Sequence, residues 1–337
     1  MSEDLEQRDD RGRTPLMRAC EEGDLEQVQR LVDKGANIEA EDQWTSPLAI
    51  SCQNGHESIV RLLIDKGAII NPWSIQRAAQ NGHAAIVELL VRAGGDVNAH
   101  GTPNPLANAS QEGHVDVVDC LLSLGADTNV KVWEEKTALM LACEKGMIDV
   151  VDRLLAAGCD VNALDKGGST ALIWASFGGH VPIIDRLVVH GADFNHQSEK
   201  GETVLITASR KGRVEAVDRL LSLGCDVNAQ GEKDWTALMW ACSVGKIDVV
   251  RFLLDHGADP LIRNKNGQNS IHLGRWSPEV RMILDGLILL SFHHHHHVPR
   301  DLRIDSKPQT DEREMTTTTT IEKNTSPRRN EIGRAHV

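Results

Sequence analysis

Two series of glycines recur at fixed intervals, and they constrain the fold of this chain more than any other feature. The first series is Gly23, Gly55, Gly82, Gly113, Gly146, Gly179, Gly212 and Gly245, and each of its last four intervals is 33 residues. The second series follows the first by 12 residues throughout, from Gly35 to Gly257. A unit of this size cannot enclose a core of its own, so it must bury its apolar surface against its neighbours. The glycines therefore predict a solenoid of stacked units.

Residues 170–195 show what one unit contains. A short apolar stripe that includes Leu172 and Ala175 precedes Gly179, and a second stripe at Ile183, Ile184, Leu187 and Val188 has the spacing of one helix face. Gly191 ends the second helix, because glycine readily adopts the left-handed conformation that closes helices. Each unit is thus predicted to be helix-turn-helix, and the fold class to be all-α.

Two short motifs recur at the ends of the units. The opening motif is seen in Thr14-Pro15-Leu16 and Thr137-Ala138-Leu139, and the closing motif in Gly191-Ala192-Asp193-Phe194-Asn195. Together with the period of 33 residues, these motifs make the chain similar to ankyrin repeat proteins over roughly residues 10–290. The resemblance implies about nine units with projecting β-hairpin loops, called fingers below. It also implies that fingers and first helices form a concave, protein-binding side.

The array has one irregularity and two flanks. Only 27 residues separate Gly55 from Gly82, so five or six residues are missing from one finger, and we expect a notch with Pro72 and Trp73 at its edge. Residues 1–9 are predicted to be a flexible arm, residues 10–290 the repeat domain, and residues 291–337 a disordered low-complexity tail whose last residues suggest a sequencing artefact. The last unit is predicted to close with a helix over residues 279–284, followed by a packed apolar segment.

Composition and charge exclude several classes of function. A net charge of −13 argues against a general nucleic-acid binder, and no apolar run approaches the ~18 residues of a membrane span. The seven cysteines mostly replace small core residues of the repeat, which favours reduced thiols in a cytosol or nucleus. We expect a soluble monomer that is cytoplasmic, nuclear or both, with no nucleic-acid or membrane partner.

The chain offers no convincing catalytic, metal or cofactor site. Histidines follow the inter-helix glycine at His56, His83, His114 and His180, but stacked repeats hold them too far apart to share zinc, so a structural hydrogen bond across the loop is expected. The recurring asparagines Asn71, Asn98, Asn129, Asn162, Asn195 and Asn228 are expected to hold the hairpin turns; the resemblance also implies that they are candidate sites of hydroxylation. Acidic residues on the second helices (Asp149, Asp152, Asp218 and Asp248) are predicted to be solvated.

The resemblance also directs attention to the exposed positions of the first helices. The two residues before each inter-helix glycine are polar or acidic at first, then include Phe177, and then become basic at Arg210 and Lys211. Phe177 is expected to be exposed with no role in the core, and aromatic anchors often dominate binding energy. The candidate partner-binding residues are Trp133, Lys145, Phe177, Arg210, Lys211 and Trp235, whereas Trp174 and Trp240 are predicted to pack between repeats.

These features predict a scaffold or adaptor without enzymatic activity. Its partner is expected to be a protein with an extended acidic segment and an apolar anchor. The alternative is a fragment of a larger signalling enzyme, ubiquitin ligase or channel, and a complete genomic reading frame would separate the two. A third hypothesis is an inhibitor of one enzyme or transcription factor.

Overall fold

The computed structural model describes residues 4–42, 45–98 and 104–294, with side chains up to residue 286. Its eighteen α-helices form nine consecutive pairs, which we number as repeats one to nine. The first helices are α1 (Pro15–Glu22), α3 (Pro47–Asn54), α5 (Pro72–Gln80), α7 (Pro105–Glu112), α9 (Ala138–Lys145), α11 (Ala171–Gly178), α13 (Val204–Lys211), α15 (Ala237–Ser243) and α17 (Ser270–Gly274). The second helices are α2 (Leu25–Asp33), α4 (Glu57–Asp65), α6 (Ala84–Arg92), α8 (Val115–Ser123), α10 (Ile148–Ala156), α12 (Val181–Val189), α14 (Val214–Ser222), α16 (Ile247–Asp255) and α18 (Pro278–His294).

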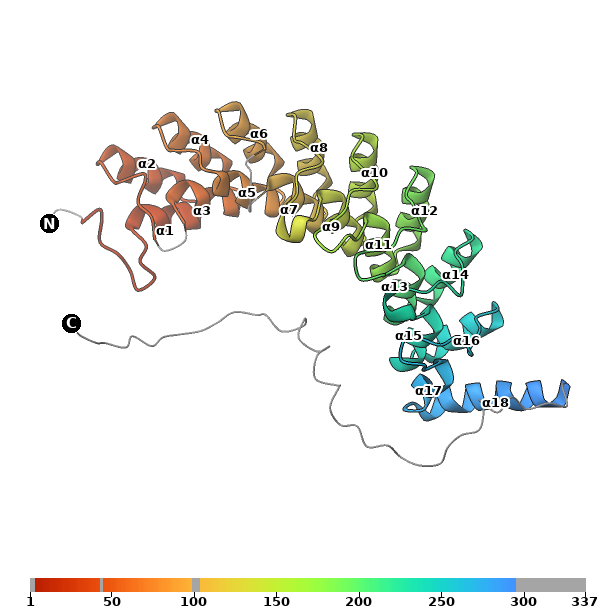
Figure 1. Ribbon diagram of the computed structural model, residues 1–337. Coiled ribbons are helices and arrows are strands. Elements are labelled where there is room, and N and C mark those ends of the chain that lie inside the picture. The colour runs from red at the N-terminus through yellow and green to blue at the C-terminus, as the bar shows by residue number, and fades with distance from the viewer. Residues whose placement is uncertain (1–3, 43–44, 99–103, 295–337) are drawn as a thin grey trace, which may run out of the picture. The chain divides into compact units, whose positions relative to one another are not determined.

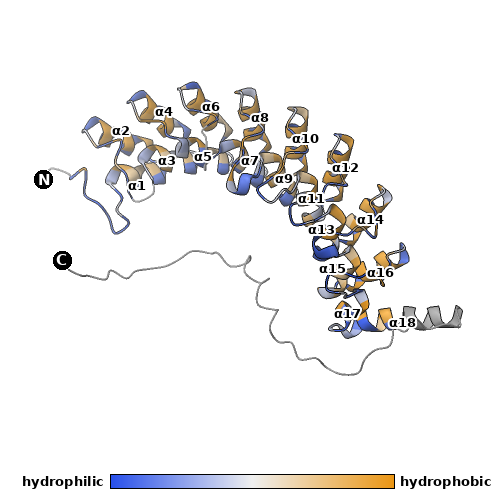
Figure 2. Cartoon of the chain, in the orientation of Figure 1, coloured by the Kyte–Doolittle hydropathy of each residue, from blue (hydrophilic) through white to orange (hydrophobic). Residues whose placement is uncertain are grey.

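The helix pairs of residues 1–287 stack side by side along a curve (Figure 1). First helices form one row, on the inner side of the curve, and second helices form the other. One continuous hydrophobic cluster runs between the rows from Leu16 to Leu284. Hydrophobic residues concentrate in the helices, whereas the connecting loops are more hydrophilic (Figure 2). The prediction of an all-α solenoid is therefore confirmed.

The two sequence motifs have clear structural roles. The threonine of the opening motif caps the first helix: the Thr170 hydroxyl accepts a hydrogen bond from the Ile173 amide at 3.4 Å, while Leu172 is fully buried. The first helix then ends at Gly179, which has a φ of 81°. Only glycine adopts this conformation without steric cost, so the glycine of the first series sets the length of the first helix.

The histidines form hydrogen bonds, but to the preceding repeat rather than across their own loop. His180 Nε2 lies 3.2 Å from the carbonyl oxygen of Glu144, and His56, His83 and His114 make equivalent contacts with Glu21, Gln53 and Gln80. Each carbonyl belongs to the last turn of a first helix and has no partner within that helix. The histidines thus tie adjacent repeats together.

Most of the recurring asparagines also bond to the neighbouring repeat, so the expectation that they hold their own turn was wrong for these residues. The Asn162 side chain donates to the carbonyl oxygen of Gly191 at 3.0 Å and accepts from the Asp193 amide at 3.0 Å. Asn98 and Asn228 make the same two bonds. Asn71 differs, because it caps α5 instead. The repeat period identified the asparagine position, but only the stacked structure shows which atoms its side chain contacts.

The fingers of repeats five to nine span residues 132–136, 165–169, 198–202, 231–235 and 264–268. Each is closed by a backbone hydrogen bond from its first to its last residue, such as that from the Asp165 amide to the Ser169 carbonyl at 3.0 Å. Among the described residues these loops contain no β-strand, so they are tight turns rather than extended hairpins. Fingers five and eight contain short 3-10 turns, η1 (Trp133–Glu135) and η2 (Glu232–Asp234).

The structure corrects two boundaries that were expected from the sequence. In the connector with the missing residues, α4 ends at Asp65 and α5 already begins at Pro72, so Pro72 and Trp73 form the first turn of a helix rather than the edge of a loop. The last helix continues through the segment expected to be separate and ends at His294. Residues 295–337 of the predicted tail lie outside the described residues.

Candidate functional site

Aromatic side chains gather on the first-helix side of repeats six to eight. Trp174 and Phe177 lie three residues apart on α11 and therefore share one helix face. Their ring centroids are 5.7 Å apart with an interplanar angle of 56°. In the next-but-one repeat, Trp240 of α15 packs on Trp235, the last residue of finger eight, with centroids 4.5 Å apart. We call these four residues the aromatic cluster.

Cations from neighbouring repeats cover the rings of the aromatic cluster. The ammonium of Lys136, at the end of finger five, lies 3.4 Å from the Trp174 centroid, and that of Lys211 lies 4.2 Å from the Phe177 centroid. The Arg210 guanidinium lies 5.4 Å from the Trp240 centroid. These distances are within the range of cation–π attraction. Because Arg210 and Lys211 are adjacent on α13, this helix links the two aromatic pairs.

The three cations differ in how their charge is balanced. Lys136 forms an ion pair with Glu144 at 2.9 Å, and Arg210 forms one with Glu202 at 2.8 Å. Lys211 has no carboxylate within ion-pair distance among the residues that the structure describes. The residue is half-buried, and its ammonium, over an aromatic face, remains free to pair with a carboxylate from outside the chain.

The indole of Trp174 is fixed from a second direction. Its Nε1 donates to Asp165 Oδ2 at 3.0 Å, and Asp165 Oδ1 accepts from the amides of Gly167 and Ser169. Asp165 is 9% exposed, and this buried carboxylate connects finger six to the indole nitrogen. Trp174 therefore lies in a fixed orientation between Asp165 and Lys136.

The structure brings together four of the six residues that the sequence singled out. Phe177, Arg210, Lys211 and Trp235 belong to the arrangement described above. Trp133 is 43% exposed on finger five and Lys145 is exposed at the end of α9, and within the described residues neither makes a ring contact or an ion pair. Phe177, expected to be exposed, is half-buried, and part of the expected positive charge at Arg210 is offset by Glu202.

The sequence did not indicate Lys136, and it indicated only the packing role of Trp174 and Trp240. Trp174 and Trp240 do pack against the hydrophobic cluster, as predicted, but each also offers a ring to a cation. Their positions could have indicated this role: Trp174 lies three residues before Phe177, and Trp240 three residues before Ser243, so each shares a helix face with a candidate surface position. Lys136 was not indicated by the sequence, because the ring that it covers, Trp174, lies in the next repeat.

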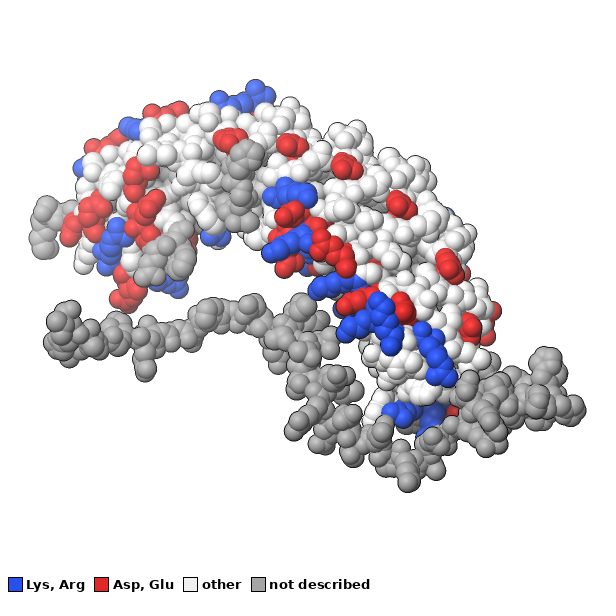
Figure 3. All heavy atoms as spheres, viewed as in Figure 1, with Lys and Arg blue, Asp and Glu red and all other residues white. Residues whose placement is uncertain are grey.

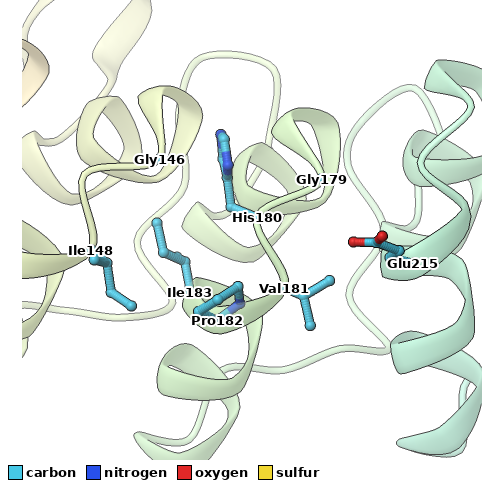
Figure 4. Close-up of a pocket in the computed structure, with 8 residues that line it drawn as sticks. All are labelled: Gly146, Ile148, Gly179, His180, Val181, Pro182, Ile183 and Glu215. Carbon is cyan, nitrogen blue, oxygen red and sulfur yellow. The ribbon is translucent and has the colours of Figure 1, made fainter.

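A shallow hollow of about 250 Å³ lies beside the inter-helix turns of repeats five and six. Ile148, His180, Val181, Pro182, Ile183 and Glu215 line it together with Gly146 and Gly179 (Figure 4). His180 is already bonded to the preceding repeat.

Burial raises the pKa of the seven thiols, as in Cys159 and Cys225, where it is about 11. Within the described ranges, no three potential metal ligands gather.

Comparison with known proteins identifies the repeat. A family model that describes three copies of the ankyrin repeat matches residues 1–72, 75–132, 139–231 and 172–264. The chain belongs to the ankyrin repeat family. Ankyrin repeats are general protein–protein interaction modules. A search of curated proteins gave no match to this chain.

The charge on the ankyrin fingers is mixed. Lys and Arg side chains line the loops between α7 and α17, with carboxylates among them (Figure 3). Exposed lysines of successive fingers include Lys166, Lys200, Lys233 and Lys265, but Glu199 and Glu232 are exposed beside them. The finger tips alone therefore do not define a basic surface.

No helix in the described part of the chain is long and apolar enough to cross a membrane.

Proposed function

We propose that this ankyrin repeat protein is a non-catalytic scaffold or adaptor that binds a protein partner at the aromatic cluster. The observation that carries the proposal is the half-buried Phe177 with the Lys211 ammonium 4.2 Å from its ring centroid, where Lys211 has no ion pair with any residue that the structure describes. Phe177 is not among the side chains packed against the hydrophobic cluster, so the fold itself does not account for this ring. Aromatic residues beside a charged group are typical of binding hot spots.

The contacts favour a partner segment that is extended, carries an apolar anchor and has acidic residues beside it. An apolar side chain would pack against the open edges of Trp174 and Phe177, while a carboxylate would pair with Lys211. Lys145, exposed and without an ion pair in the described residues, would supply a second positive charge. The other aromatic pair offers less charge, because Glu202 already balances Arg210.

We further propose that the protein acts as a monomer in the cytoplasm, the nucleus or both. All seven cysteines are free thiols, and most are buried in positions that other repeats fill with small residues. This pattern supports a reducing compartment. Partner binding would thus occur among intracellular proteins.

The test is affinity capture with the full chain beside a double variant, Phe177→Ala with Lys211→Ala. Bound proteins are identified by mass spectrometry. We expect the variant to lose a specific set of partners while circular dichroism shows an unchanged helix content. A matched control is Val189→Ala, which truncates a side chain that is 82% exposed at the end of α12, away from the cluster. Capture of the same partners by all three proteins would refute the proposed site.

A further inference from the structure

Three kinds of polar contact join neighbouring repeats in the C-terminal half of the solenoid. The turn contact runs from the residue after the inter-helix glycine to a carbonyl of the preceding repeat, as in His180 and Glu144. The helix ion pair joins consecutive second helices, as in Arg186 and Asp152 at 3.1 Å. The finger bond is a backbone hydrogen bond between adjacent fingers. These contacts add to the apolar packing that all repeats share.

The junctions between repeats five and six and between six and seven each have all three contacts. Besides the two pairs above, the first junction has a bond from the Lys166 amide to the Glu134 carbonyl at 2.8 Å. The second has Arg213 Nε donating to the Phe177 carbonyl at 3.3 Å, Arg219 paired with Asp185 at 2.6 Å, and the Glu199 amide donating to the Gly167 carbonyl at 3.0 Å. Asp152, expected to be solvated, is thus an ion-pair partner.

The junction between repeats seven and eight has none of the three, although every residue concerned lies in the described part of the chain. Phe252 occupies the position of Arg186 and Arg219, so Asp218 has no ion-pair partner there. Lys246 occupies the position of His180 but donates no hydrogen bond to repeat seven. No finger bond joins the Glu232 amide to finger seven.

The missing finger bond has a visible cause. Fingers seven and eight meet backbone to backbone at two glycines: a Cβ on Gly201 would lie 2.2 Å from the Glu232 nitrogen, and one on Gly231 would lie 2.2 Å from the Gly201 oxygen. This approach places the Glu232 amide beside Gly201 rather than opposite a carbonyl. The finger bond resumes at the next junction, where the Lys265 amide donates to the Lys233 carbonyl at 3.0 Å.

Some contacts do cross the junction between repeats seven and eight. The Asn228 side chain bonds to the Gly257 carbonyl and the Asp259 amide, Gln197 Nε2 donates to the Gln230 carbonyl at 3.3 Å, and Arg210 lies over Trp240. Apolar packing of α13 on α15 continues through it. The junction is therefore intact but has fewer polar contacts than its two N-terminal neighbours.

We propose that the solenoid opens at this junction, so that repeats eight and nine undock together while repeats five to seven stay stacked. The stability of a repeat array is close to a sum of unit and nearest-neighbour terms, and local opening is favoured at an interface with fewer contacts than its neighbours. This inference goes beyond the proposed function and does not depend on it. Because Arg210 and Trp240 lie on opposite sides of the junction, opening would separate that cation from its ring.

Hydrogen exchange of the full chain, followed by mass spectrometry, tests the proposal. We expect a step at the junction: amides of α15 and α16 should exchange at least about tenfold faster than those of α13 and α14, which should resemble α11 and α12. Fraying from the C-terminus would instead give a gradual change from repeat to repeat. A gradual change, or a step at another junction, would overturn the proposal.

Two variants that add a missing contact make the test sharper. Phe252→Arg would allow an ion pair with Asp218, and we expect it to slow exchange in α15 and α16 by roughly 1.5- to 5-fold, the range for exposed pairs. The gain should vanish when Asp218→Asn is added. Lys246→His would supply the turn contact without touching Phe252 and should slow the same amides. If both single variants fold and neither slows exchange, the missing contacts do not determine the opening.

Discussion

The ammonium of Lys211 lies 4.2 Å above the Phe177 ring, and the ring belongs to the repeat before it. On the same helix, Trp174 has a cation from the other neighbouring repeat: the ammonium of Lys136, in repeat five, lies 3.4 Å from its ring centroid. The two lysines differ in what else they contact. Lys136 is 13% exposed and paired with Glu144, whereas Lys211 has no ion-pair partner among the described residues. This difference separates a structural lysine from one available to a partner.

Replacing the two lysines should therefore have different effects on stability. Lys136→Ala removes a shielded ion pair and a cation–π contact, and it should lower the free energy of unfolding by about 1–2 kcal/mol. Lys211→Ala should change it by less than about 0.5 kcal/mol. Urea denaturation followed by circular dichroism measures both. Equal losses for the two variants would contradict the distinction drawn between them.

Two glycines of repeat five provide a matched pair of substitutions. Gly146 and Gly158 have φ angles of 80° and 77°, so alanine at either position incurs the left-handed penalty of about 1–2 kcal/mol. A Cβ on Gly146 would also lie 2.6 Å from His180 Cε1, whereas nothing lies within 4 Å of one on Gly158. Gly146→Ala should therefore cost about 1 kcal/mol more, because it disrupts the bond from His180 to Glu144.

Thermal unfolding of the two variants tests that difference. His180→Ala alone should reproduce the additional loss, and Gly146→Ala should cost no more than Gly158→Ala when both are made in the His180→Ala background. If Gly146→Ala were still the more costly change in that background, the histidine would not be the cause.

Finger five should become more stable when a strained residue is replaced by glycine. Glu134 has a φ of 53°, in the left-handed region, and the equivalent residue of finger seven, Lys200, does not have a positive φ. Glu134→Gly should raise the free energy of unfolding by about 0.5–1 kcal/mol, since the strain is relieved. Lys200→Gly should lower it by a similar amount, because glycine only adds entropy to the unfolded chain. A loss of stability in both variants would show that the Glu134 conformation carries no cost.

Stability should decline in alkaline solution, starting near pH 9. Burial raises the pKa of Cys20, Cys159 and Cys225 from 9.0 to about 11 and that of Cys242 to about 12. Each folded-state pKa exceeds the unfolded value, so the unfolded chain releases protons that the folded protein retains. The stabilisation that the buried, protonated thiols provide is fully present below pH 9 and is lost as the pH rises through 11.

Urea midpoints at pH 7.5, 9 and 10 measure this dependence. The chain has no tyrosine, so phenol ionisation does not contribute in this range. A double variant, Cys159→Ala with Cys225→Ala, places the alanine of other repeats at both positions and should show a shallower decline. A midpoint that stays constant from pH 7.5 to 10 would contradict the expected titration of the thiols.

The sequence predicted those parts of the fold that depend on a single repeat. The glycine series placed both helices of each pair, because a positive φ at Gly179 or Gly191 is a local requirement. The cysteine pattern identified buried thiols for the same reason. Contacts between repeats were harder to predict, since the period does not show how far one unit is displaced relative to the next. The roles of Asn162 and His180 were therefore seen only in the structure.

The candidate site was predicted in part for the same physical reason. Phe177 and the basic pair on α13 were visible as departures from the repeat, and the structure places them together. The contact between Lys136 and Trp174 depends on stacking across the junction between repeats five and six, which no local pattern records. Among the described residues, Lys211 has no carboxylate within ion-pair distance, and this too is a property of the assembled solenoid.

Repeat three shows which of its contacts hold a unit to its neighbours. It lacks a finger, yet His83 still bonds to the Gln53 carbonyl and His114 to that of Gln80, so both of its junctions keep their turn contact. The spacing of the units is thus maintained at the edge opposite the fingers. Loops at the finger edge can accordingly be shortened, lengthened or exchanged while the register of the helices is kept, which makes that edge the natural place to graft a new binding specificity onto this chain.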